Sequence, residues 1–323
     1  MENKQNVTEL TTYQHKFLDA VDRIKHKSAK EDRAIACYSI ELIHTPLPYS
    51  DPGDIMSYRL KNRDKKIYIQ GSAHHGYPYG TYPRLILIWI IGEVFKNRYR
   101  AKQAGMHPDK VTKEARYIKH GHITQFVRQL GVEPTGSAQS STGNGTIQEI
   151  KDQMLRLLGS KISFIDSRGT NKDVDKEQGI FINVSDFYDL TWHKGKIKEN
   201  KEAGYFWISE QFYTKLVSSV FPIDLRAVHA LRKSPLAIDL YCWATHKAYS
   251  LNKPLEIGWE KFAEQFGYGY SEPRYLGKEV RKAFDKICQL YPDLKVEFPR
   301  GRIKIYPSST HIPKNHVPQW INR

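Results

Sequence analysis

Five polar side chains recur on one side of the segment 271–290, and four of them are cationic. At helical spacing these side chains share the face opposite a stripe of apolar residues. They are Arg274, Lys278, Arg281, Lys282 and Gln289. Lysine and arginine neutralise phosphates, and in the major groove arginine pairs with guanine and glutamine with adenine. The pattern predicts an amphipathic helix that binds double-stranded DNA, and the alternative is an ordinary solvated surface.

A cationic hairpin is predicted directly after this helix. The segments 294–298 and 302–306 alternate in polarity as strands do, and a Pro-Arg-Gly turn joins them. Its cations are Arg300, Arg302 and Lys304. A helix followed by such a hairpin is typical of winged-helix proteins, in which the hairpin contacts the backbone or enters a narrow A·T-rich minor groove. The alternative is a polar turn that contains a glycine.

Two close histidine pairs, His74-His75 and His120-Gly121-His122, are the candidates for metal-assisted catalysis. A DNA-nicking enzyme needs such a pair on a strand, with a nucleophilic tyrosine nearby. Here a glycine separates the second pair in a predicted loop, and twenty tyrosines make a nearby tyrosine uninformative. The sequence also has no phosphate-binding P-loop, no clustered carboxylates and no dinucleotide fingerprint. We therefore expect no catalytic residues, no metal and no cofactor.

The composition favours a polyanionic partner. The formal charge is +15 over 323 residues and the isoelectric point is near 9.5, which favours attraction to phosphates. The three cysteines are distant from one another and odd in number, which fits a reducing cytoplasm. The most apolar run, 85–91, is far shorter than the about 20 residues that a membrane span needs. We expect a cytoplasmic protein without a membrane partner.

The elements that would position the cationic helix recur once upstream. A long helix, a short helix, a turn, an amphipathic helix and a hairpin are predicted over 81–184 and again over 224–306. Within the first unit the polar segment 106–121 is predicted to be a loop. This order predicts an α+β fold, mainly helical, with two tandem winged-helix domains, each a helix-turn-helix with a β-hairpin wing.

Four segments follow from that order and from the chain length. They are an N-terminal helical segment of unassigned role, 1–33; a first winged-helix domain with N-terminal strands, 34–209; a second domain as the main DNA-binding head, 210–310; and a tail, 311–323.

The corresponding helix of the first unit, 146–158, has a mixed outer face. Gln148 and Arg156 are candidates for DNA contact, but Glu149 and Asp152 lie on the same face and repel phosphates. Two interpretations stay open for this helix: direct DNA contact, or a packing or protein interface.

Three segments resemble the RepA family of plasmid replication initiators. They are FPIDLRA with LRKSPLAIDLYCW (221–243), PYGTYPRLILIWI (78–90), and QMLRLL after GTI (145–158). They occur in the family's order, within a resemblance that runs from about residue 34 to 306.

The resemblance implies a bacterial, plasmid- or nucleoid-associated DNA-binding protein that binds repeats in the double-stranded plasmid origin and helps to open an A·T-rich segment. It also implies recruitment of the host initiator and the replicative helicase. Related initiators repress their own gene as dimers and bind the repeats as monomers, so the first domain would be the candidate for homodimer contacts. A plain transcriptional repressor and, less favoured, an origin-nicking enzyme are the alternatives.

Overall fold

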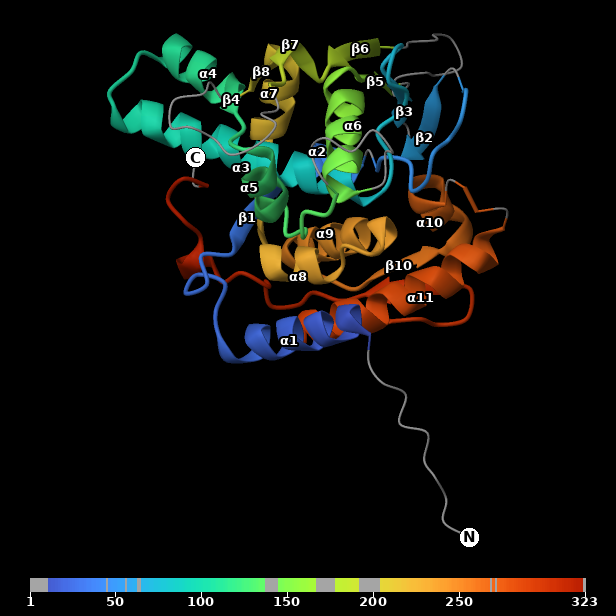
Figure 1. The fold of residues 1–323 in the computed structure, drawn as a ribbon. Helices are drawn as coiled ribbons and strands as arrows, with labels where there is room; N and C mark the ends of the chain where they lie inside the picture. Colours follow the sequence, from blue (N-terminus) through green and yellow to red (C-terminus); the bar gives the residue numbers. More distant parts are fainter. Residues whose placement is uncertain are drawn as a thin grey trace.

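Helices and short antiparallel sheets are interleaved along the whole chain. Figure 1 shows the computed structural model, which describes residues 11–321 apart from 45, 56, 63–64, 137–144, 167–177, 192–203, 268 and 271. The strands of this described part pair antiparallel in four sheets, with strand orders β1-β9, β10-β12-β11, β2-β3-β5-β6 and β4-β8-β7. The predicted α+β class is confirmed.

The N-terminal segment is built into the second half of the chain. Helix α1 (Thr12–His26) begins in a capping box between Thr11 and Gln14, and it buries Phe17 and Val21. It packs on α8 (Leu225–Ala230) and α11 (Pro273–Leu290). The fully buried strand β1 (Ile35–Ser39) then pairs with β9 (Val220–Asp224), a strand that the sequence did not predict.

The first half surrounds a long buried helix, α3 (Thr81–Gln103). Its other elements are α2 (Ile40–Ile43), β2 (Tyr58–Asn62), β3 (Lys65–Gln70), α4 (Pro108–Arg116), β4 (Tyr117–Lys119), α5 (Ile123–Gln129), α6 (Thr146–Leu158), β5 (Lys161–Asp166), β6 (Gln178–Asn183), β7 (Ser185–Asp189) and β8 (Tyr205–Ile208).

Two features of this half differ from the sequence prediction. The segment 106–121, predicted to be a loop, forms α4 and β4, because Pro108 starts a helix whose Val111 and Ala115 are buried against the body. The hairpin of β5 and β6 forms as predicted. However, β5 also pairs with β3, so the hairpin is part of a four-stranded sheet rather than a separate wing.

The second half surrounds another buried helix, α9 (Pro235–Ser250), which Ser234 caps by accepting a hydrogen bond from the Ala237 amide. In Figure 1, α9 lies between α6 above it and α11 below it. The remaining elements are α7 (Glu210–Ser218), β10 (Leu255–Gly258), α10 (Trp259–Phe266), β11 (Val296–Glu297), β12 (Arg302–Ile305) and a 3₁₀ turn (Lys314–His316).

A buried ion pair joins the two long helices. Arg84 of α3 donates two hydrogen bonds to Asp239 of α9, at 2.9 and 2.7 Å, and both side chains are almost inaccessible. The remaining guanidinium N–H groups donate to the backbone carbonyls of Leu47, Pro48 and Gly80. All the strong donors of Arg84 are thus directed at acceptors, which a buried charge requires.

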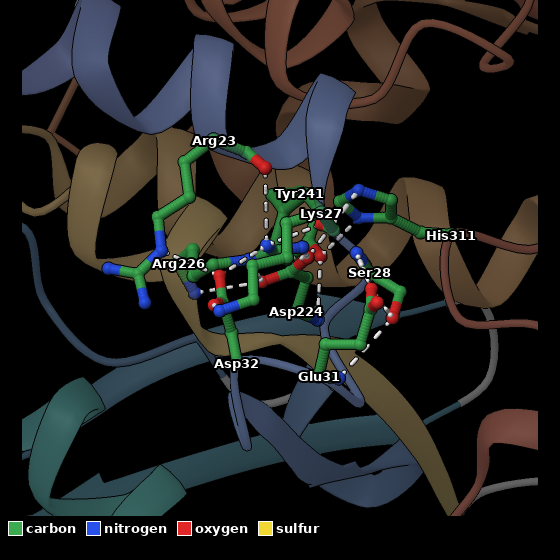
Figure 2. Close-up of polar contacts among 9 residues, drawn as sticks. All are labelled: Arg23, Lys27, Ser28, Glu31, Asp32, Asp224, Arg226, Tyr241 and His311. Carbon is green, nitrogen blue, oxygen red and sulfur yellow. Dashed lines mark hydrogen bonds and ion pairs between the residues drawn. The ribbon is translucent and has the colours of Figure 1, made fainter.

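A second ionic cluster holds α1 against the second half (Figure 2). Arg226 at the start of α8 donates to Asp224 at 2.6 Å, to Asp32 at 2.7 Å and to the Lys27 carbonyl at 2.7 Å. Arg23 and Lys27 lie 2.6 and 2.8 Å from the same Asp32 carboxylate. Their hydrogen bonds hold the pKa of Asp32 well below its usual range. Three cations from two helices therefore converge on one carboxylate beside the β1–β9 pair.

The C-terminal tail folds back onto the same region. His311 stacks on Tyr291 and lies beside Tyr241, whose hydroxyl accepts a hydrogen bond from the Asp224 amide. The Tyr241 proton is therefore directed at Nδ1 of His311, 2.7 Å away. Burial lowers the pKa of His311 to about 4, so this imidazole is neutral at pH 7.

Buried apolar side chains form one cluster that extends from Phe17 to Ile321 and includes residues of both halves. The predicted division near residue 210 is therefore crossed by apolar packing, by the β1–β9 pair and by the Arg84–Asp239 ion pair.

We predict that Asp239→Asn lowers the free energy of unfolding by about 3–5 kcal/mol, because the new amide N–H₂ faces a buried guanidinium that has lost its counter-charge. Urea unfolding measures this change. In the exposed pair Glu279–Lys282, Glu279→Gln is the matched control and should cost no more than about 1 kcal/mol. Equal effects of the two substitutions would contradict the role given to the buried pair.

We also predict that stability falls as the pH is lowered from 7 to 5. Unfolded His311 takes up a proton near pH 6.5, whereas folded His311 resists protonation until about pH 4, so the unfolded state binds more protons in this window. Its contribution over this interval is about 2 kcal/mol. The groups around it are Asp224, Arg226, Tyr241 and Tyr291.

His311→Gln should give a flatter dependence of unfolding free energy on pH than the wild type, measured by urea unfolding at both pH values. A slope equal to that of the wild type would show that His311 does not carry this effect.

Candidate nucleic-acid interface

Helix α11 is positioned by its apolar face. It begins at Pro273 with Glu272 as the N-cap, while Ser271, the predicted cap, lies outside the described residues. It packs against α9 and α10 through the buried side chains Leu276, Val280, Ala283, Phe284, Ile287 and Leu290. The predicted amphipathic helix is confirmed, and burial of this stripe leaves the opposite face exposed.

The outer face contains four of the five predicted residues as exposed side chains: Arg274, Lys278, Lys282 and Gln289. The fifth, Arg281, is half-buried. Its guanidinium carbon lies 5.2 Å from the Trp259 ring centroid and 5.6 Å from that of Phe298, and it donates to the Gly277 carbonyl. Arg281 is therefore held in place by two aromatic rings.

A glycine allows this arrangement. A Cβ atom at Gly277 would lie 3.2 Å from the Trp259 ring, closer than ordinary packing permits. The glycine lets α11 approach the start of α10, where Trp259 stacks on Phe298 of the hairpin. Helix and hairpin are thereby packed as one unit.

The hairpin itself is a three-stranded sheet. β12 pairs with both β10 and β11, and the Trp259 amide donates to the Gly301 carbonyl in the turn. Gly301 has φ +79°, a conformation that favours glycine. Arg300 precedes it as an exposed residue at the tip.

Most of the predicted cations have a carboxylate partner within the protein. Arg274 pairs with Glu272 at 2.6 Å and Lys282 with Glu279 at 2.7 Å. The exposed Asp285 adds a negative charge one helical turn beyond Arg281 on the same face. Gln289 is also engaged, since it donates to the Asp285 carbonyl.

Glu256 of β10 neutralises the hairpin. It lies opposite Lys304 in the strand register, and its oxygens are 3.0 Å from Arg302 and 3.1 Å from Lys304. Hydrogen bonds from these two cations lower the pKa of Glu256. Among the predicted cations, Lys278 and Arg300 have no ionic or hydrogen-bond partner within the described residues.

Residue Tyr275 was missed in the sequence, although it adjoins the cationic stripe. Its side chain is 47% exposed, and Arg274 lies 4.9 Å from its ring centroid. An exposed aromatic ring beside a cation can contact a base methyl group or a sugar. The sequence signal was its position on the border between the apolar and cationic faces. Glu256 gave no such signal, because its partners depend on strand pairing.

The two candidate side chains on α6, Gln148 and Arg156, make contacts within the protein. Gln148 donates to Asp152 at 2.8 Å. Arg156 donates to the Tyr77 carbonyl, lies 3.6 Å from Asp51, and covers the ring of Tyr79. Arg156 thus holds the loop before α3 against α6.

A cleft of about 760 Å³ separates α6 from α1 and from the turn between α8 and α9. Its cationic lining is Lys16, Arg156, Arg232 and Lys233. Its acidic lining is Glu133, Glu149 and Asp152. The near balance of charge makes it a weaker site for a polyanion than the tip of the hairpin.

The histidine pairs have local structural contacts. His120 is buried and directs Nδ1 at the Gly121 carbonyl, and His122 caps α5 by accepting from the Thr124 amide. Within the described part of the chain no group of three or more potential ligands could hold a metal ion. No helix in that part is long and apolar enough to cross a bilayer.

Comparison with solved structures finds two crystal structures of domains 2 and 3 of RctB. The first, of selenomethionine derivatives, has a TM-score of 0.49 and 11% identity, and the match covers 83% of this chain and 96% of that chain. The second has a TM-score of 0.46 and 9% identity, with 82% and 96% covered. Curated proteins give no match.

A family profile described as plasmid encoded RepA protein matches residues 77–260. The match includes α3, α6 and α9 with the ion pair between Arg84 and Asp239, and it ends before α11 and its hairpin. Because it covers more than half of the sequence, the chain belongs to the family of plasmid-encoded RepA proteins.

Proposed function

We propose that this protein initiates plasmid replication by binding repeats in double-stranded origin DNA, without catalytic chemistry of its own. Membership of the RepA family supports a role in replication initiation. The observation that carries the DNA-binding proposal is the pair of unpartnered cations, Lys278 on the outer face of α11 and Arg300 at the hairpin tip. Both residues lie outside the family match at 77–260. The DNA-binding proposal therefore depends on where the structure places these two side chains and not on family membership.

The second half is proposed to be a winged helix. Its elements follow the order α9, β10, α10, α11, β11, β12, and the first strand pairs with the last in the sheet β10-β12-β11. In such a unit α11 enters the major groove and the hairpin of β11 and β12 is the wing. The contacts of Trp259 with Arg281 and Phe298 support a fixed angle between helix and wing.

The paired cations need an exchange of partners before they contact phosphate. Arg274, Lys282, Arg302 and Lys304 each give up an intramolecular carboxylate when they bind DNA. Such an exchange gains less than contact by a free cation, because an intramolecular ion pair is lost. Lys278 and Arg300 should therefore contribute most to affinity, while Arg281 is oriented for base contact by its aromatic neighbours.

For the first half we propose a protein-facing role. Gln148 and Arg156 are engaged within the protein, and Glu149 and Asp152 oppose phosphate contact. Contact with a second copy or with the host initiator and helicase fits this helix better than base recognition. We propose no nicking activity, since His120 and His122 have structural contacts.

Footprinting on the plasmid region that flanks this gene tests the proposal. Protected repeats spaced by one or two helical turns are expected, together with replication in trans of a plasmid that contains the region. Protection of a promoter alone, without replication, would identify a repressor. Open-circular product from supercoiled DNA with Mg²⁺ would identify a nicking enzyme.

We predict that Lys278→Ala and Arg300→Ala each weaken DNA binding and each reduce the slope of log affinity against log salt by about 1. Titrations between 50 and 200 mM salt measure both quantities, and with six or more phosphate contacts wild-type affinity should fall by about a thousandfold. Lys282→Ala, whose charge is already paired, should have a smaller effect, and Lys102→Ala on α3 is the remote control. If Lys278→Ala and Arg300→Ala both bind DNA with wild-type affinity, this placement of DNA is wrong.

We predict that Glu256→Gln, unlike the alanine substitutions, strengthens DNA binding. Removal of this carboxylate frees Arg302 and Lys304, so affinity should rise severalfold and the salt slope should steepen by about 1–2. The matched control is Glu260→Gln, which neutralises an exposed carboxylate on neighbouring α10. If the two glutamine variants bind alike, Glu256 does not compete with DNA for the wing.

A further inference from the structure

A cavity of about 510 Å³ lies where both halves of the chain meet the C-terminal tail. Its size falls within the range of small-molecule sites in proteins, about 300–1,000 Å³. The walls come from β1, α3, α5 and α8, and the apolar lining consists of Ile35, Ala36, Leu85, Ile88, Trp89, Leu130 and Leu225.

A glycine in the middle of α3 keeps this cavity open. Gly92 is buried and lines the cavity, yet a Cβ atom built on it would meet nothing within 4 Å. Helix packing therefore does not require glycine here. A glycine in a helix interior costs about 1 kcal/mol relative to alanine, so α3 is less stable at a position where a side chain would narrow the cavity.

A largely buried histidine, His229, borders the same space. The Nε2 atom of His229 is inaccessible and has no hydrogen-bond partner among the described residues. The imidazole is fixed against Gly131, where a Cβ atom would lie 2.3 Å from the ring. Burial lowers the pKa of His229 to about 4, so this part of the wall is neutral at pH 7.

The rim of the cavity is cationic. Lys30, Arg33 and Lys96 lie around it with one carboxylate, Glu93, which pairs with Lys96 at 2.8 Å. Arg33 is the one non-glycine residue of the described chain with positive φ, +53°. The rim thus has a net positive charge above an apolar interior.

The tail closes one side of the cavity. Pro318 and Trp320 line it, Lys96 lies 5.9 Å from the Trp320 ring centroid, and Tyr99 donates to Gln319. An aromatic ring beside a lysine at an opening can cover the boundary between the apolar and charged parts of a ligand.

We propose that this cavity binds a small amphipathic anion. Its apolar body lies among α3, α5 and α8, and its acidic head lies beside Lys30, Arg33 and Lys96. The chemical class is an aromatic or aliphatic body with a single carboxylate or sulfonate. The walls provide too few donors for a nucleotide, and the cationic rim favours an anion over a neutral ligand. This site is separate from the proposed DNA interface.

Fluorescence titration with 8-anilinonaphthalene-1-sulfonate tests the proposal on the full chain. One saturable site is expected, together with quenching of tryptophan emission, since Trp89 and Trp320 line the cavity. Decanoate should displace the probe. Titration without saturation, or saturation that decanoate leaves unchanged, would overturn the proposal.

Substitutions that fill the cavity locate the probe. Gly92→Leu should weaken binding at least tenfold, and Gly92→Ala should weaken it less, with thermal unfolding measured for both to show that they are folded. Wild-type affinity in a folded Gly92→Leu protein would place the probe elsewhere and overturn the proposal.

Recognition of the charge is tested with a neutral probe. Arg33→Gly, which also removes the unfavourable φ, should weaken binding of the sulfonate severalfold but leave binding of N-phenyl-1-naphthylamine unchanged. Lys253→Gln, at an exposed lysine remote from the cavity lining, is the control and should alter neither. Equal loss for both probes would refute recognition of an anionic head.

Discussion

The buried ion pair between Arg84 and Asp239 links the central helices of the two halves. It joins α3 and α9. Each of these helices supports one helix that contains candidate DNA-contact residues, since α6 packs on α3 and α11 packs on α9. The same guanidinium holds the Leu47, Pro48 and Gly80 carbonyls. Because a buried charge tolerates little displacement from its acceptors, this contact restrains α3 and α9, and through them the helices α6 and α11 that pack on them.

Charge is distributed differently from what the total of +15 suggests. On the outer face of α11 and on its hairpin, cations alternate with carboxylates, and Glu256 alone holds two of them. A surface of this kind is nearly neutral at short range but remains positive at a distance. In the proposed DNA complex, long-range attraction would speed association, and affinity at contact would depend on a few unpaired side chains such as Lys278 and Arg300.

The sequence predicted local elements well and long-range contacts poorly. The apolar periodicity of 271–290 and the proline that starts α9 identify helices without knowledge of the rest of the chain. Strand β9 was missed because its partner β1 lies almost two hundred residues earlier. The segment 106–121 was read as loop because only Val111 and Ala115 of α4 are buried. The partners of Arg302 and Lys304 depend on strand register, which no local pattern encodes.

The pairing of β1 with β9 also has a consequence for synthesis on the ribosome. β1 leaves the exit tunnel early, but its partner is translated some 190 residues later, a delay of roughly ten to forty seconds at bacterial elongation rates. During that time an apolar strand has no native partner and is a target for chaperones. The nascent polypeptide cannot complete this sheet until more than two thirds of its length has been made, so β1 reaches its native pairing late in synthesis.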